Sequence, residues 1–379
     1  MKVFNSTLAA IGLAAFVFAS CSDSNSDPAG PTAPVINPAD LTSVKLVAQQ
    51  IDNSNIANYK NSTANARKFF LTRAGETNFT TAMPKAPEKR DYTKVLNLSG
   101  PGELTNQVYA ISSGKDIDFK GQKINGATIF VDGTCTMQYD ETTQMSNTTI
   151  VLLSSAKLIY NGTGEMIPSG CTVYCTNPRN VFSAKNDIKI NGKFYADFRD
   201  QKSDGSKDLI TGLGAIAETT AEQKKKTITP TQNITFGSGA DVFINGSIRA
   251  INLQVEDGAN VYAEENLFNN NNNGSANIKG NLYIGGFIKT HRLDVTGYLQ
   301  AKEAVKVTDA FNVQSGANVY AKYINVTDNT KDGQTVIQKG NATLSLNGTG
   351  KIFIGNENVI TVNNLVTDNA SEGQITLEG

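Results

Sequence analysis

The sequence is poor in the residues on which many enzymes and metal sites depend. It has no tryptophan, one histidine (His291), four cysteines and five methionines among 379 residues. A catalytic mechanism built on histidine would depend on His291 alone. The cysteines lie far from it in sequence, and the Cys-x3-Cys spacing of Cys171 and Cys175 is by itself a weak indication of zinc ligands. We therefore expect no metal site and no cofactor.

An excess of charge of either sign is also missing. The chain has 34 lysine and arginine residues against 35 aspartate and glutamate residues, a net charge of −1. Proteins that bind nucleic acid neutralise phosphates with a basic surface, so we expect no nucleic-acid partner. The run of three lysines at 224–226 is interpreted as part of a solvated loop.

Glycine and asparagine, in contrast, are abundant, with 33 and 41 residues in a chain that is 39% hydrophobic. Both residue types tolerate the positive φ angles of tight turns. This composition therefore favours many short strands joined by tight turns.

Residues 1–20 have the pattern of an export signal. Lys2 supplies a positive start, and residues 8–20 form an apolar run that is too short to be a membrane-spanning helix. The residues FASC at 18–21 resemble a bacterial lipobox, in which the cysteine, here Cys21, is lipidated and becomes the mature N-terminus. The polar, proline-containing residues 21–35 are typical of a flexible tether.

Together these segments resemble the N-termini of lipoproteins of Bacteroidota-type bacteria. The resemblance covers residues 1–35 and implies an outer-membrane lipoprotein, exposed at the cell surface and attached to the membrane through a lipid on Cys21. Ordinary secretion, with an unmodified cysteine at position 21, is the alternative.

From residue 108 to the end, apolar residues recur at every second position in short segments. Examples are GATIFVDG at 126–133, GKFYADF at 192–198 and GKIFIGN at 350–356. This period is that of a β-strand, and no window beyond residue 108 holds the 3.6-residue period of a helix. The sequence predicts an all-β fold.

A repeated phrase indicates how the strands are arranged. It reads SGADVF at 238–243, DGANVY at 257–262 and SGANVY at 315–320, and Gly258 and Gly316 each follow an earlier glycine, Gly239 and Gly297, by 19 residues. A repeat of about this length with strands in each unit is the signature of a solenoid. We predict a single-stranded, right-handed parallel β-helix with about 20 residues per coil. The shared pattern also predicts stacks of valines (Val255, Val295, Val313) and of alanines (Ala263, Ala301, Ala321).

Residues 279–307, with glycines followed by paired apolar positions, resemble the short coils of bactofilins, cytoskeletal β-helices that polymerise end to end. The chain more loosely resembles β-helix adhesins and polysaccharide lyases. The resemblance implies a β-helix and self-association through its ends. Residues 359–379 still have strand character, so we expect an unpaired last coil, an edge that invites association.

The expected organisation has four parts. The signal (1–20) and the tether (21–35) precede a mostly irregular lead-in (36–107), which could cap the β-helix. The β-helix itself occupies 108–379. It is interrupted by loops at 199–232 and 269–277, and such insertions are tolerated because loop-closure entropy grows slowly with length.

Three cysteines follow the signal and tether: Cys135, Cys171 and Cys175. The last two are four residues apart, so in a strand their side chains point to the same face. One interpretation is that the three are buried thiols acting as small apolar side chains, and the other is a disulfide between Cys135 and one of the other two.

The repeated phrase also places aromatic residues at outward-facing positions. In NVYAE at 260–264, Val261 and Ala263 point inward by the alternation of a strand, so Tyr262 points outward. Because coils of a β-helix stack at about 4.8 Å, equivalent residues would form an aromatic stripe, broken once by Gln300. The stripe has six members: Tyr195, Phe243, Tyr262, Tyr283, Tyr320 and Phe353.

Three interpretations of the stripe remain open. The stacked rings stabilise neighbouring coils, or they are covered by the lead-in or by the loop at 199–232. In the third interpretation they bind a flat apolar partner, either the sugar rings of a polysaccharide or a surface protein.

The acidic residues are scattered, and the pair Asp116 and Asp118 is typical of a solvated strand rather than of acid–base catalysis. We therefore expect a non-enzymatic, lipid-anchored surface β-helix with a structural or adhesive role. The alternatives are a polysaccharide-degrading lyase or hydrolase and a self-assembling, bactofilin-like envelope scaffold.

Overall fold

The computed structural model describes residues 35–36, 79–89, 94–96, 98, 100, 102–111, 114–198, 212–213, 232–269, 273–328, 341–362, 364–367 and 374–377. These residues contain β-strands and no helix. The strands are parallel and stacked as a β-solenoid of about 10 turns of ~21 residues, which confirms the predicted parallel β-helix.

The chain forms two compact units. The first unit comprises Glu76–Asn270 and Lys279–Gly285, and the second comprises Met1–Gly75, Asn271–Ile278 and Gly286–Gly379. The strands of the first unit are β2 (Lys94–Val95), β3 (Glu103–Thr105), β4 (Val108–Ile111), β5 (Asp116–Asp118), β6 (Lys123–Asn125), β7 (Thr128–Val131), β8 (Thr136–Tyr139), β9 (Gln144–Ser146), β10 (Thr149–Leu152), β11 (Lys157–Tyr160), β12 (Thr172–Cys175), β13 (Val181–Ala184), β14 (Ile188–Ile190), β15 (Lys193–Asp197), β16 (Gly212–Leu213), β17 (Ile234–Phe236), β18 (Asp241–Asn245), β19 (Ser247–Ala250), β20 (Asn252–Val255), β21 (Asn260–Ala263), β22 (Leu267–Asn269) and β24 (Asn281–Ile284). The strands of the second unit are β1 (Val35–Ile36), β23 (Ser275–Ile278), β25 (Ile288–Val295), β26 (Tyr298–Val313), β27 (Asn318–Val326), β28 (Thr343–Leu346), β29 (Lys351–Val362), β30 (Asn364–Thr367) and β31 (Gln374–Leu377).

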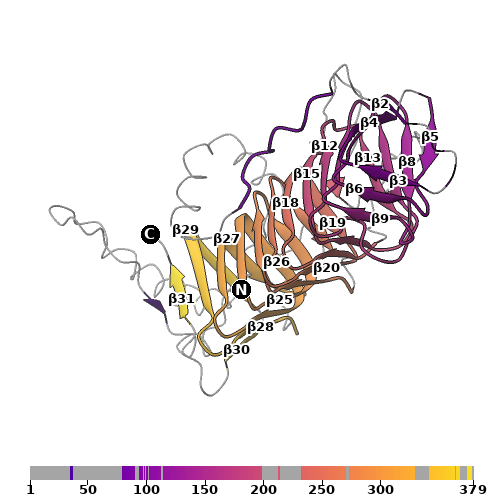
Figure 1. Cartoon of the computed structure of the whole chain (residues 1–379). Coiled ribbons are helices and arrows are strands. Elements are labelled where there is room, and N and C mark those ends of the chain that lie inside the picture. Colours follow the sequence, from indigo (N-terminus) through magenta and orange to yellow (C-terminus); the bar gives the residue numbers. More distant parts are fainter. Residues whose placement is uncertain are drawn as a thin grey trace, which may run out of the picture. The chain divides into compact units, whose positions relative to one another are not determined.

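A turn of the solenoid contains three short strands, each paired in parallel with the equivalent strand of the next turn. The turn made by β6, β7 and β8 pairs with the turn made by β9, β10 and β11. In these pairs Lys123 lies opposite Gln144, Thr128 opposite Thr149, and Thr136 opposite Lys157. Within the first unit, β12, β15 and β18 lie side by side in this way (Figure 1).

The core of each unit is a stack of inward-facing side chains. In the first unit, one such column contains only buried residues in direct register: Ile129, Ile150, Val173, Phe194, Val242, Val261 and Leu282. In the second unit, Leu299, Val319, Ile352 and Ile375 form an equivalent buried column. Because every second residue of each strand points inward, stacking the turns buries an apolar interior without tryptophan.

The predicted valine and alanine stacks are confirmed in part. Val295 lies opposite Val313, and Ala301 lies opposite Ala321. Val255 instead lies opposite Phe236, and Ala263 lies opposite Ile284. The interior therefore alternates small and large side chains where the simple repeat predicted uniform stacks.

Glycine is required at one corner of the turn, where Gly280 directly precedes β24. At Gly280, an added Cβ would lie 2.3 Å from the Glu256 carbonyl oxygen and 2.7 Å from that of Ala259. Gly192 occupies an equivalent corner before β15, where a Cβ would lie 2.4 Å from the Cys171 carbonyl oxygen. Only a residue without a side chain fits at these close backbone approaches.

Three predicted boundaries are wrong. The lead-in at 36–107 contains β2 and β3, which pair in parallel with β4 and β6, so the solenoid begins before residue 108. The loop at 199–232 contains β16, which pairs with β19. The loop at 269–277 includes the end of β22 and the start of β23. Strands of two to four residues are too short to show a period of two against a polar background.

The last strand of the chain is paired on both sides. β31 lies parallel to β29, and on its other edge it pairs antiparallel with β1, with Val35 opposite Thr376 and Ile36 opposite Ile375. At β31, therefore, the last coil does not present the free edge that the sequence predicted. The predicted signal, Cys21 and the tether up to residue 34 lie outside the described residues.

Candidate functional site

The first unit contains a continuous column of outward-facing aromatic residues, which we call the aromatic column. Its members are register partners in successive turns: Tyr174, Tyr195, Phe243, Tyr262 and Tyr283. The Tyr262 and Tyr283 rings are stacked with centroids 4.4 Å apart and 1° between their planes, and the Phe243 and Tyr262 rings are stacked at 5.6 Å. The prediction missed Tyr174, although it follows the inward-facing Val173 in the same alternation and lies 5.3 Å from Tyr195.

Residues 79–89, which we call the strap, lie over this column. The Phe79 ring contacts two members in tilted geometry, with its centroid 6.4 Å from that of Tyr262 and 6.2 Å from that of Tyr283. The Thr80 hydroxyl donates a hydrogen bond of 2.8 Å to the Asp241 carboxylate. Figure 1 shows the strap as the indigo segment that runs along the first unit toward β2.

The other end of the strap lies against the first turns of the solenoid. Ala86 packs against a buried cluster of Ala110, Phe130 and Val151. These three residues are register partners, and Val151 lies opposite Tyr174, so the cluster extends the aromatic column. The Lys89 ammonium lies 3.4 Å from the Asp132 carboxylate.

Four of the five rings of the column are buried. Tyr195 and Phe243 are each 4% exposed, Tyr262 is 0% exposed and Tyr283 is 1% exposed. These four rings are therefore not an open binding surface, and the contacts of Phe79 and Thr80 favour the interpretation in which the lead-in lies over them. Alternation along a strand determines the outward direction of a side chain but not whether another segment covers it.

Asp241 joins the strap to the column. One carboxylate oxygen accepts the hydrogen bond from Thr80, and the other accepts a bond of 2.6 Å from the Tyr195 hydroxyl. Burial, together with the bond to Asp241, raises the pKa of Tyr195 well above its ordinary value. The Tyr195 hydroxyl therefore stays protonated and donates to Asp241.

The second unit has a smaller aromatic stack, which is partly exposed. The Tyr320 and Phe353 rings are stacked at 4.5 Å with 7° between their planes, and Tyr298 lies 5.4 Å from Tyr320 in tilted geometry. Gln300 lies opposite Tyr320, is fully buried, and accepts a hydrogen bond of 2.7 Å from the Tyr298 hydroxyl. Of the six predicted stripe residues, only Tyr320 and Phe353 are reachable from solvent.

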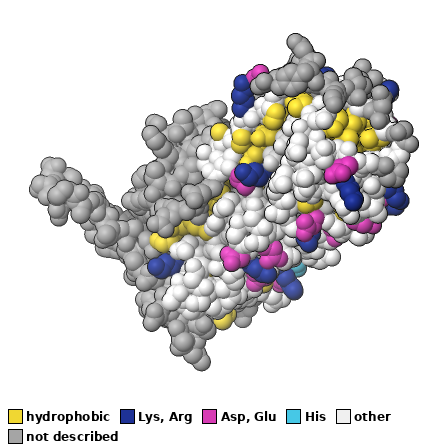
Figure 2. Space-filling view, in the orientation of Figure 1, with side chains coloured by type: hydrophobic (Ala, Val, Ile, Leu, Met, Phe, Trp, Pro, Cys, Tyr) yellow, Lys and Arg dark blue, Asp and Glu magenta, His cyan; other side chains and the backbone are white. Residues whose placement is uncertain are grey.

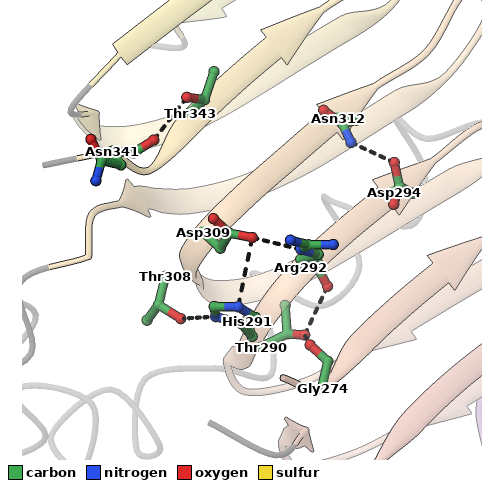
Figure 3. Close-up of polar contacts among 10 residues, drawn as sticks. All are labelled: Gly274, Thr290, His291, Arg292, Asp294, Thr308, Asp309, Asn312, Asn341 and Thr343. Carbon is green, nitrogen blue, oxygen red and sulfur yellow. Dashed lines mark hydrogen bonds and ion pairs between the residues drawn. The ribbon is translucent and has the colours of Figure 1, made fainter. Parts of the chain in front are cut away.

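The single histidine takes part in a polar cluster on the second unit (Figure 3). Its Nδ1 lies 3.1 Å from the Thr308 hydroxyl, and its Nε2 lies 3.6 Å from the Asp309 carboxylate. The same carboxylate accepts a hydrogen bond of 2.6 Å from the Arg292 guanidinium. Because Arg292 and His291 share one carboxylate across neighbouring segments of β25 and β26, this arrangement ties two turns together by charge.

The cysteines and acidic residues also have structural surroundings. Cys135, Cys171 and Cys175 are buried, and because Cys171 and Cys175 are free thiols, neither of them forms the predicted disulfide with Cys135. Asp116 accepts a hydrogen bond from the Thr136 backbone N–H, and Asp118 accepts one from the Lys120 backbone N–H. Throughout the described ranges, no three His, Cys, Asp or Glu side chains are grouped as metal ligands would be. On the face shown in Figure 2, acidic and basic side chains are interspersed rather than separated by sign.

Comparison with known proteins gives no match: no protein-family model fits the sequence, and no curated protein or solved structure is similar to it at a significant level. Within the part of the chain that the structure describes, no helix has the length and apolar character needed to cross a membrane.

Proposed function

We propose that the protein is an exported, lipid-anchored, non-enzymatic β-solenoid with a structural and adhesive role at the surface of a Bacteroidota-type bacterium. The lipid on Cys21 attaches it to the outer membrane, and residues 22–34 separate the folded part from the lipid. The solenoid provides extended faces that contact a polysaccharide or a surface protein.

The observation that carries the structural role is the closure of the aromatic column by the chain itself. A platform for an external ligand would leave its rings accessible, but four of the predicted stripe residues are buried, and Phe79 of the strap contacts two of them, Tyr262 and Tyr283. The stacked rings therefore hold successive turns together and fix the strap, as expected of a structural role.

The adhesive role is assigned to the stack in the second unit. Tyr320 and Phe353 present two parallel rings at 4.5 Å, both partly exposed. Aromatic rings at a surface bind the apolar faces of sugar rings and the side chains of partner proteins.

The lipid anchor is tested in whole cells by labelling with a fatty acid and by digestion of the intact cells with protease. The wild-type chain should incorporate a labelled fatty acid and be digested by protease added outside intact cells. The Cys21→Ala variant should lose the label and be released from the membrane. A wild-type chain that carries no lipid would refute the anchor and leave ordinary secretion.

An array of polysaccharides and surface glycoproteins tests the adhesive role. We expect Tyr320→Ser to weaken binding to the recognised ligand, whereas Tyr323→Ser should not. Tyr323 is a suitable control because it is a partly exposed tyrosine on the same strand, β27, outside the stack. Equal binding by wild type and Tyr320→Ser would exclude the stack as the site.

A further inference from the structure

The last turn of the second unit is closed by a strand from the start of the sequence. β30 and β31 form this turn, one step beyond β28 and β29. β1 pairs with the edge of β31 that faces away from β29, with Ile36 opposite Ile375. Ile375 is fully buried and ends the column of Leu299, Val319 and Ile352. The first strand of the chain therefore lies one strand beyond the last turn.

This pairing determines where the tether enters the folded protein. Residues 21–34 directly precede Val35, so the chain that starts at Cys21 enters the structure at β1. Fourteen residue steps (35 − 21) separate Cys21 from Val35. Fully extended, they span about 50 Å, and a flexible chain of this length has a root-mean-square span of about 20 Å. A lipid on Cys21 would thus hold the last turn of the second unit close to a membrane surface.

The earlier turns of the second unit lie progressively farther from this attachment. One column of partly or largely exposed residues crosses β23, β25, β26, β28 and β30 in register, and its members are Asn277, Asp294, Asn312, Ser345 and Val366. At about 4.8 Å per strand, the steps of this column place Asn277 about 19 Å from Val366. The two ends of the column therefore differ clearly in their distance from β30, where the last turn begins.

The last turn also exposes apolar side chains. Val366 is 51% exposed and is the exposed large apolar residue of the described part of the chain. Its neighbour Leu365 is partly exposed, although the preceding members of its column, Leu344 and Phe311, are fully buried. A nearby lipid surface would remove this apolar surface from water.

We propose that the last turn of the second unit, made by β30 and β31 and closed by β1, faces the membrane, and that the earlier turns of this unit extend away from it. The pairing of β1 with β31 carries this inference, because it attaches the tether to the last turn and not to an earlier one. The inference rests on the lipid proposed for Cys21 and specifies which part of the protein that lipid holds at the membrane.

Energy transfer from single fluorophores to the membrane tests this orientation. Val366→Cys and Asn277→Cys variants of the full chain are exported, purified from membranes and labelled with the same donor. They are then added to preformed vesicles that carry an acceptor on their lipid headgroups. Cys135, Cys171 and Cys175 are buried, so they should not react in the native protein. We expect several-fold more transfer from Val366→Cys than from Asn277→Cys.

Two controls separate the contributions of β1 and of the lipid. Val35→Pro combined with Ile36→Pro removes the N–H groups that β1 offers to β31, so the tether should no longer enter at the last turn. The difference between the two labelled positions should then decrease. An unchanged difference would overturn the role of β1 in the orientation. A Cys21→Ala chain labelled at Val366→Cys gives the transfer that occurs without a lipid.

The possible results separate this inference from the proposed anchor. Greater transfer from Val366→Cys in the membrane-bound chain supports the orientation. Equal transfer, or greater transfer from Asn277→Cys, overturns the orientation and leaves the lipid anchor standing. Failure of the chain to bind the vesicles overturns both the anchor and the orientation.

Discussion

Replacement of Phe79 by alanine should release the N-terminal end of the strap. Phe79 is partly buried and makes two tilted ring contacts, with Tyr262 and with Tyr283. Aromatic pairs of this kind contribute about 0.5–1.5 kcal/mol each. Taken together, they predict a loss of about 2 kcal/mol in the free energy that holds the strap closed. A loss of this size raises the open population about 30-fold.

Limited trypsin digestion can measure this change, with cleavage after Lys85 followed by mass spectrometry. Cleavage within a folded segment requires local opening, so its rate follows the open population when closing is fast. We expect the Phe79→Ala variant to be cut after Lys85 about 30-fold faster than wild type.

Phe268→Ala is a suitable control for the digestion. Phe268 is a partly exposed ring in the first unit, and the Arg249 guanidinium lies 4.4 Å above it, away from the strap contacts described above. The control should leave cleavage after Lys85 unchanged. A change of less than about threefold in the cleavage rate of Phe79→Ala corresponds to less than about 0.7 kcal/mol. Such a result would show that the ring contacts of Phe79 do not hold the strap in place.

Three further predictions concern the solenoid. Gly280→Ala would place a Cβ 2.3 Å and 2.7 Å from two backbone oxygens and should lower the free energy of unfolding by about 1–3 kcal/mol. Its melting temperature should be lower than that of the control Gly102→Ala, where the nearest atom to the added Cβ lies 3.4 Å away. Equal melting temperatures for the two variants would refute the close backbone approach at Gly280. Burial alone would raise the pKa of Asp132, but hydrogen bonds and the charge of Lys89 lower this pKa below 3.8 in the folded protein. The ionised Asp132 carboxylate therefore stabilises the folded protein above pH 3.8, and this contribution is lost as the pH falls through the lower pKa of the folded state. Wild type should therefore lose more thermal stability between about pH 5 and pH 3 than Asp132→Asn, and equal losses would contradict this. Burial raises the pKa of Cys175, so its thiol should react with maleimide only in denaturant, and labelling of the native protein would show that the site opens.

The alternation of side chains could be predicted because it follows from the backbone of a strand alone. Val261 and Ala263 are fully buried inside the solenoid, and Tyr262 between them points outward, as the phrase NVYA predicts. The stacking of repeated phrases in register follows from the same regularity. Asp241 and Phe243 lie opposite Asn260 and Tyr262 because both phrases begin at the same corner.

The cover over the aromatic column could not be located from the sequence. The strap, FTTAMPKAPEK, has no period of two or of 3.6, so no local pattern marks it as an ordered segment. Its contact from Thr80 to Asp241 joins residues 161 positions apart, and such a contact depends on where the solenoid places Asp241. Side-chain contacts between a non-repetitive segment and a repetitive surface cannot be predicted from the local sequence pattern of either segment.

The pairing of β1 with β31 has a consequence for the order in which the protein is completed. Val35 is synthesised 341 residues before its partner Thr376 (376 − 35). Contacts this distant along the chain form late in folding, and this one cannot form until β31 has been synthesised. A chain that stops before β31 would leave the edge of β29 open and β1 without its partner. The closed edge therefore depends on the presence of both β1 and β31.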